Sequence, residues 1–170
     1  MKTALQWLMV ASLLTIGAGS RAEDGAYSEH VARVADNTVI AGTLDLDALK
    51  AQHPDDVLIV DLRTPAEGTA EEAKAAEALG FSYENIPVSS PKVDPAQVDA
   101  LRALLDGADA DTLVVVHCAS GNRAGMLWGA MRVEDGVPVG SVEETLSGVL
   151  TKPPTIAGLE GYAQALNAEP

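Results

Sequence analysis

Short apolar runs alternate along the chain with segments whose apolar residues recur at helical spacing. Four of the runs are predicted strands, because they are rich in branched and aromatic residues and are bounded by polar or turn-forming ones. They are Thr38–Gly42, Val57–Leu62, Phe81–Val88 and Thr112–His117. The last is the clearest candidate for a buried strand, since it carries three consecutive valines.

The segments between and after these strands have the spacing of helices. The predicted helices are Leu44–Gln52, Thr69–Gly80, Pro95 to about Leu105, about Arg123–Arg132, one that begins at Ser141, and roughly Ile156–Leu166. Thr69 and Glu72 have the spacing of a capping box, and Gly80 ends that helix. Because strands alternate with helices, we expect an α/β fold with a mostly parallel sheet flanked by helices on both faces.

The first 22 residues have the pattern of a secretory signal peptide. Lys2 precedes the apolar stretch Leu5–Ile16, which is too short to span a membrane, and Ser20-Arg21-Ala22 is a small–x–small cleavage site. Cleavage after Ala22 predicts a periplasmic or secreted protein without a membrane anchor; the alternative is an uncleaved anchor. Residues 23–37 are polar and are interpreted as an irregular lead-in, which leaves 38–170 as the folded domain.

Charge and composition narrow the range of partners. The chain of 170 residues has a formal net charge of −14, so its surface repels nucleic acid and anionic membranes. An anionic substrate must therefore be attracted by a local positive group. The three histidines, His30, His53 and His117, lack the spacing of metal ligands, and no glycine-rich nucleotide-binding motif occurs, so we expect neither a metal nor a cofactor.

The stretch VVVHCASGNRAG, residues 114–125, carries the strongest chemical signal. Its Cys118 is the only cysteine of the chain and follows a buried strand, at the edge where parallel α/β folds bind ligands. The backbone amides of the loop that follows, together with the start of the next helix, could bind an anion and stabilise a thiolate. These loop residues are Ala119, Ser120, Gly121 and Asn122. Arg123 adds a planar pair of N–H donors.

We therefore interpret Cys118 as a nucleophile and Arg123 as its anion-binding partner. The alternative is a buried structural thiol beside a surface arginine. His117 would face the opposite side of the sheet from Cys118, which favours a structural role over that of a general base.

Asp94 and Arg63 are two further candidate site residues, and each also has a simpler structural explanation. Asp94 is the acid on the loop after the third strand, but before Pro95 it is also a good N-cap, and we favour the cap. Arg63 ends the second strand and is either a second anion contact or the partner of Asp61 or Glu67. Ser89, Ser90 and Lys92 lie on the adjacent loop and either line the pocket or form a surface loop, and we favour the surface loop.

The segment VVVHCASGNRAGMLW resembles the active-site segment of the phosphatase-like domain of beta-lactamase hydrolase-like proteins, within the protein-tyrosine-phosphatase-like superfamily. The resemblance extends from about Val39 to Leu166, through VLIVDLR and FSYENIPV in the order of dual-specificity-like phosphatases. It implies a phosphatase-like fold with the cysteine loop between the last core strand and the following helix. It also implies that Cys118 takes the transferred group and that Arg123 holds its oxygens.

The loop length departs from the phosphatase pattern. Tyrosine phosphatases place five residues between cysteine and arginine, whereas four separate Cys118 from Arg123, as in the Cys-x-x-Gly-x-Arg loop of many rhodaneses. The segment DLRTPAE, residues 61–67, also resembles the Asp-x-Arg-x-x-x-Glu element of rhodaneses. A tighter loop suits a persulfide better than a phosphoryl group with three equatorial oxygens.

Three functions remain open on this basis. The favoured one is persulfide transfer through Cys118, from a small anionic sulfur donor to a thiol acceptor. The second is a phosphatase that forms phosphocysteine on a small phosphate ester or a phosphoprotein. The third is a non-catalytic anion-binding or redox-sensing module that uses the same loop.

Overall fold

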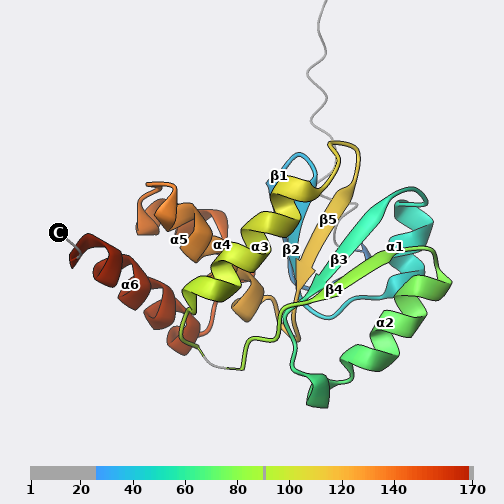
Figure 1. Ribbon diagram of the computed structural model, residues 1–170, viewed down its shortest axis with the longest axis horizontal. Helices are drawn as coiled ribbons and strands as arrows, with labels where there is room; N and C mark the ends of the chain where they lie inside the picture. Colours follow the sequence, from blue (N-terminus) through green and yellow to red (C-terminus); the bar gives the residue numbers. More distant parts are fainter. Residues whose placement is uncertain (1–25, 90, 169–170) are drawn as a thin grey trace, which may run out of the picture.

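The computed structural model describes residues 26–89 and 91–168, which form a five-stranded sheet flanked by helices (Figure 1). The strand order is β1-β2-β5-β3-β4, with only β1 antiparallel to its neighbour. The strands are β1 (Val31–Ala35), β2 (Thr38–Ala41), β3 (Val57–Asp61), β4 (Ser82–Asn85) and β5 (Leu113–His117). The expected α/β fold with a mostly parallel sheet is confirmed.

The helices divide between the two faces of the sheet, as Figure 1 shows. Those of one face are α1 (Leu46–Gln52) and α2 (Thr69–Ala78). Those of the other are α3 (Pro95–Gly107), α4 (Asn122–Glu134), α5 (Val139–Thr145) and α6 (Pro153–Ala168). Each face has its own buried apolar cluster, because alternate residues of the central strand β5 point to opposite sides: Val115 belongs to the first cluster, and Val116 and Cys118 to the second.

Two expectations about local structure are wrong. The lead-in 23–37 is not irregular throughout, because Val31–Ala35 forms β1 and pairs with β2. The capping box Thr69–Glu72 does not form, since α2 begins after Gly68 without a side-chain cap. The box lies earlier, between Thr64 and Glu67 of the short 3-10 helix η2 (Pro65–Glu67). Glu72 instead ion-pairs with Arg63, which needs a counter-charge in the interior, and lies beside His117.

The signal peptide interpretation concerns residues 1–22, which lie outside the described residues, so export stays a prediction. Within the described ranges, no helix combines the length and the apolar character that a membrane crossing requires.

Helix α6 packs tightly against the loop between β4 and α3. Gly158 faces the Pro91 carbonyl so closely that a Cβ atom built on it would lie 1.8 Å from that oxygen. Only a glycine allows this approach of helix and loop backbone. The contact joins the C-terminal helix to the carboxyl edge of the sheet, where the cysteine loop lies.

Gly158→Ala should therefore destabilise the protein by about 2 kcal/mol or more, because helix and loop must move apart. Gly161→Ala is the matched control on the same helix, since its Cβ would meet no atom within 4 Å. It should stabilise the fold by roughly 0.5–1 kcal/mol through helix propensity. Urea unfolding of both variants measures the difference, and equal effects would contradict the close contact.

Candidate active site

The cysteine loop begins where β5 leaves the sheet and is tied to the end of β2. The Cys118 amide donates to the Ala41 carbonyl at 3.3 Å, and Gly42 pairs with Ser120 in an antiparallel bridge. Gly121 adopts a φ of +76° and is the N-cap of α4. These contacts hold the start of the loop against β2, and Cys118 itself is buried, with 1% of its surface exposed.

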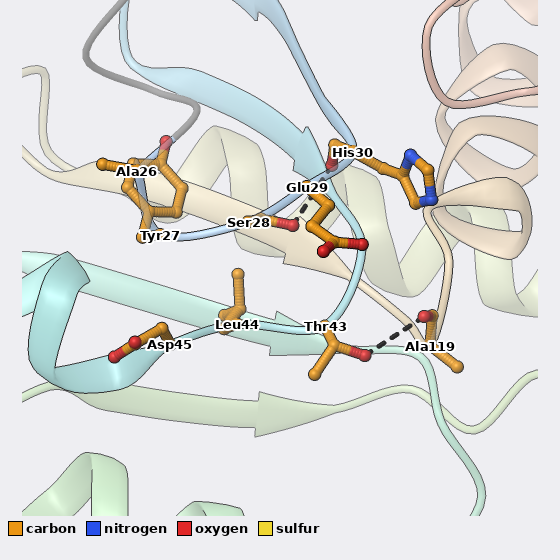
Figure 2. A pocket seen from close by; sticks show the side chains of 9 residues that line it. All are labelled: Ala26, Tyr27, Ser28, Glu29, His30, Thr43, Leu44, Asp45 and Ala119. Atoms are coloured by element: carbon orange, nitrogen blue, oxygen red, sulfur yellow. Dashed lines mark hydrogen bonds between the residues drawn. The ribbon is translucent and has the colours of Figure 1, made fainter.

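The connection between β2 and α1 supports the loop from outside. The Thr43 hydroxyl donates to the Ala119 carbonyl at 3.1 Å, as Figure 2 shows. Ala119 also borders a pocket of about 380 Å³ formed by residues 26–30 and 43–45. These contacts of Ala119 and Ser120 fix the shape of the loop, and their expected anion-binding role stays a prediction.

The start of α4 supplies amides that the helix does not use. The first intrahelical bond runs from the Gly125 amide to the Gly121 carbonyl at 2.7 Å. The three amides before it, those of residues 122–124, therefore have no carbonyl to bind within the helix. They lie directly after the cysteine loop, where the helix dipole favours negative charge.

Asn122 contributes to the site differently from the expectation. Its side chain is buried, and its Oδ1 atom accepts bonds from the amides of Thr151 and Lys152 at 2.8 and 2.6 Å. The side chain therefore binds the connection before α6, and only the backbone amide of Asn122 is available for an anion.

Arg123 is bound on one edge of its guanidinium group. Its Nη1 and Nη2 atoms donate to the two carboxylate oxygens of Glu67 at 2.9 and 2.7 Å, and Nη1 also donates to the Val88 carbonyl at 3.0 Å. Of the five N–H groups of an arginine, these bonds use three. The Nε edge remains, with one Nη2 hydrogen, for a second bidentate partner.

The same guanidinium lies near the Cys118 side chain, which contributes to its electrostatics. The hydrogen bonds that Arg123 donates to Glu67 and, after them, the interaction with Cys118 raise the pKa of Arg123 above its ordinary value. The structure thus brings together the two residues that the sequence predicts as the catalytic pair.

Glu67 is itself held in place by the η2 turn. Its Oε2 atom accepts bonds from the Thr64 amide at 2.8 Å and the Thr64 hydroxyl at 2.9 Å. The bond from Arg123, followed by the Thr64 amide, lowers the pKa of Glu67 to about 2. Glu67 is therefore ionised at neutral pH and is fixed as the partner of Arg123.

Arg123 and Glu67 line an open pocket of about 570 Å³ at the carboxyl edge of the sheet. Its other walls come from the β4–α3 loop, the start of α6 and the residue before η2: Ser89, Pro91, Pro154, Thr155 and Thr64. Ser89, interpreted from the sequence as part of a surface loop, is thus a wall residue. Lys92 is not a wall residue, and Ser90 lies outside the described residues.

Arg63 lies on the α1–α2 side of the sheet and does not meet Cys118. Its guanidinium binds the Asp61 carboxylate at 2.8 Å and that of Glu72 at 2.7 Å. Both contacts are intramolecular ion pairs, and a second anion contact of Arg63 stays a prediction. The alternative of a pair with Asp61 is confirmed, with Glu72 in the place expected for Glu67.

His117 is fully buried in the same cluster, on the opposite face from Cys118 as expected. Its Nε2 atom lies 2.9 Å from Glu72 Oε1 and 3.6 Å from Asp61 Oδ1. Burial raises the pKa of Asp61, but hydrogen bonds from Arg63 and Tyr83 and the nearby His117 outweigh it and lower the pKa below its usual value. His117 therefore belongs to a polar network beneath the sheet edge, which agrees with a structural role.

Asp61, Glu72 and His117 also bring one potential ligand atom each within 4.8 Å of one another. These residues do not fit a metal ion well, because the Arg63 guanidinium already binds both carboxylates as a cation. Tyr83 donates a further bond to Asp61 at 2.6 Å. Within the described residues the cluster is an internal polar network held by the Arg63 ion pairs, in which Glu72 Oε1 and both ring nitrogens of His117 lack a hydrogen-bond partner.

Asp94 is the N-cap of α3, as the sequence favours. Its Oδ1 atom accepts a bond from the Ala96 amide at 3.0 Å, and it does not line the pocket. The structure therefore gives no support to Asp94 as a catalytic acid.

Comparison with known proteins identifies the fold. The family model described as "Beta-lactamase hydrolase-like protein, phosphatase-like domain" matches residues 31–134. A beta-lactamase hydrolase-like protein of Xylella fastidiosa is 34% identical over 83 residues, 46% of this chain. The match spans only 19% of that relative's length.

Solved structures agree. A candidate phosphatase from Shewanella putrefaciens superposes with a TM-score of 0.67 at 17% identity, covering 88% of this chain and 96% of the other. TpbA of P. aeruginosa, as a cysteine-to-serine variant in complex with phosphotyrosine, gives a TM-score of 0.59 at 16% identity, covering 88% of this chain and 100% of the other. The chain therefore has the fold of the cysteine-based phosphatases, as the sequence resemblance predicts.

The Glu67–Arg123 pair should be visible in the pH dependence of stability. Because the pKa of Glu67 falls from its ordinary 4.5 to about 2 on folding, the stabilisation is fully present above about pH 4.5 and is lost as the pH falls through about 2. Urea unfolding should show a constant difference between the wild type and Glu67→Gln at neutral pH, which shrinks in acid.

Glu71→Gln is the matched control, since Glu71 lies four residues further on and forms no ion pair in the described part of the chain. Its difference from the wild type should lack this acid-dependent loss. A Glu67→Gln difference that stays constant down to about pH 2 would contradict the ion pair.

Proposed function

Because the chain belongs to the family of phosphatase-like domains of beta-lactamase hydrolase-like proteins, we propose that it is a cysteine-dependent phosphatase. Cys118 is the nucleophile, and Arg123 binds the oxygens of the phosphoryl group. The observation that carries this proposal is the arrangement of Arg123, which lies near enough to Cys118 to interact electrostatically while Glu67 occupies only one edge of its guanidinium. The free Nε edge and the first amides of α4 are the donors for an anion.

The proposed reaction has two steps. The Cys118 thiolate attacks phosphorus, an S–P bond forms, and the P–O bond to the leaving group breaks. Water then attacks phosphorus, and the S–P bond breaks to release inorganic phosphate and the thiolate. Arg123 stabilises the charge on the phosphoryl oxygens in both steps.

The pocket also restricts the substrate. Glu67, the carboxylate beside Arg123, is ionised at neutral pH and cannot donate a proton to a leaving oxygen. Asp94 caps α3 outside the pocket. We therefore infer a preference for phosphate esters whose leaving group departs without protonation, such as aryl phosphates. The net charge of −14 makes Arg123 the local attraction for the phosphate.

Sulfur transfer is the second candidate, favoured by the four-residue spacing between Cys118 and Arg123 and by the lack of an acid in the pocket. In that reaction the Cys118 thiolate takes the sulfane sulfur of thiosulfate, an S–S bond forms on Cys118, and sulfite leaves. A thiol or cyanide then removes the sulfur. A thiolate or sulfite is a good leaving group, so this chemistry needs no proton donor.

One set of variants tests both candidates. With 4-nitrophenyl phosphate, Cys118→Ser should abolish phosphate release, and Arg123→Ala should lower kcat/KM about 10²–10³-fold through lost oxyanion stabilisation. Arg132→Ala, at the far end of the same helix, should retain activity, since among the described residues Arg132 pairs with Asp135 and lies over the Trp128 ring, away from the pocket. Formation of thiocyanate from thiosulfate and cyanide, without phosphate release, would establish sulfur transfer in place of phosphatase activity.

The lack of a proton donor gives a separate prediction. Across a series of substituted phenyl phosphates, kcat/KM should rise steeply as the leaving phenol becomes more acidic, by about tenfold or more between the extremes. Steady-state kinetics at constant pH measures this slope. A flat dependence would show that a side chain protonates the leaving group.

A further inference from the structure

Asn122 makes an unusual set of contacts for a residue of a catalytic loop. Its Oδ1 atom accepts three bonds, from the amides of Thr151 and Lys152 at 2.8 and 2.6 Å and from the Thr155 hydroxyl at 3.2 Å. Its Nδ2 atom donates to the Ser120 carbonyl at 3.2 Å. One buried carboxamide thus joins the cysteine loop to a segment about 30 residues further along the chain.

The segment Thr151–Thr155 depends on this side chain. In the described part of the chain, its long-range hydrogen bonds all go to Asn122, while the remaining ones, such as Thr155 to the Lys152 carbonyl, are local. Removal of the Asn122 carboxamide would leave the three donors that bind its oxygen without a partner in the interior. The position of the segment is therefore set by the cysteine loop.

This segment borders the pocket beside Arg123. Pro154 and Thr155 form one wall, and Ser89 and Pro91 form a neighbouring one. The close approach of Gly158 to the Pro91 carbonyl holds the two walls together from behind. The pocket opening is thus bounded by the start of α6 on one side and by the β4–α3 loop, which α6 contacts through Gly158, on the other.

The direction of attack relates these walls to the leaving group. A leaving group departs in line with and opposite to the nucleophile. Cys118 lies buried beneath the loop, and Arg123 holds the phosphoryl oxygens, so the leaving group points outward along the pocket. The wall residues Pro154 and Thr155 are then beside the leaving group.

We propose that Asn122 is a positioning residue that fixes Thr151–Thr155 as the outer wall of the pocket, and that this wall determines which leaving groups are accepted. The proposal rests on the proposed function, because it takes the pocket beside Arg123 as the substrate site. Asn122 acts through the wall and does not itself bind the phosphoryl group with its side chain.

The kinetic test compares a compact and a bulky ester, 4-nitrophenyl phosphate and 4-methylumbelliferyl phosphate. Asn122→Ala should change the ratio of their kcat/KM values about tenfold, through KM, with kcat for the compact ester changed less than about threefold. Asn122→Asp retains the three bonds to Oδ1 and loses only the bonds that Nδ2 donates. Because the wall depends on Oδ1, the ratio should remain close to that of the wild type.

Asn85→Ala is the control for the loss of a structural asparagine. The Asn85 side chain likewise bridges backbone groups, donating to the Asp61 and Arg63 carbonyls at 2.7 and 2.9 Å, but it does not touch the cysteine loop. It should lower stability and leave the ratio unchanged. A ratio that shifts equally in Asn85→Ala and Asn122→Ala would overturn the specific role of Asn122.

A second measurement is independent of turnover. Hydrogen exchange of the Thr151 and Lys152 amides should be about tenfold faster in Asn122→Ala than in the wild type, and close to wild-type in Asn122→Asp. Unchanged exchange in Asn122→Ala would overturn the positioning role. If the wild type hydrolyses neither ester, the proposed function fails together with the leaving-group role, whereas faster exchange would still support the positioning role.

Discussion

Side chains alternate along a strand, and at the end of β5 this constraint separates two adjacent residues into different layers. His117 enters the polar network with Asp61, Arg63 and Glu72, and Cys118 enters the opposite layer beneath α4. The first network fixes the carboxyl ends of β3 and β5 through buried ion pairs, and the second layer carries the reactive group. Because β5 lies between β2 and β3, both neighbours hold the loop that follows.

The two arginines at this edge of the sheet differ in the number of carboxylates that bind them. Arg63 is bound on both sides by carboxylates and contributes to structure alone. Arg123 has one carboxylate partner, Glu67, and its Nε edge forms no hydrogen bond within the described residues. The charge of Arg63 is therefore neutralised by two carboxylates, whereas Arg123 keeps N–H donors for a second anionic partner. The difference lies in the number of acidic partners that the fold supplies.

Sequence patterns predicted the parts of the site that are local in the chain. Cys118, Gly121 and Arg123 lie within six residues, so the local pattern predicted the strand, the turn and the start of the helix. The pair Asp94-Pro95 likewise predicted an N-cap. The partners of these residues were not, because Glu67 and Arg123 are 56 positions apart and Asn122 binds 29–33 positions away. Capping-box spacing occurs at both Thr64–Glu67 and Thr69–Glu72. The difference is that Glu72 pairs with the buried Arg63 beside His117, which the sequence does not show. The strand β1 was missed because its polar flanks resemble a loop.

The family match ends at residue 134, but the pocket does not. Pro154 and Thr155 belong to α6, which lies beyond the matched region and packs against α4 on the same face of the sheet. The chemistry and the shape of the opening are thus encoded in different stretches of the chain. Because Asn122 ties the start of α6 to the cysteine loop, an insertion or deletion in the last two helices would disturb the reactive loop together with the opening.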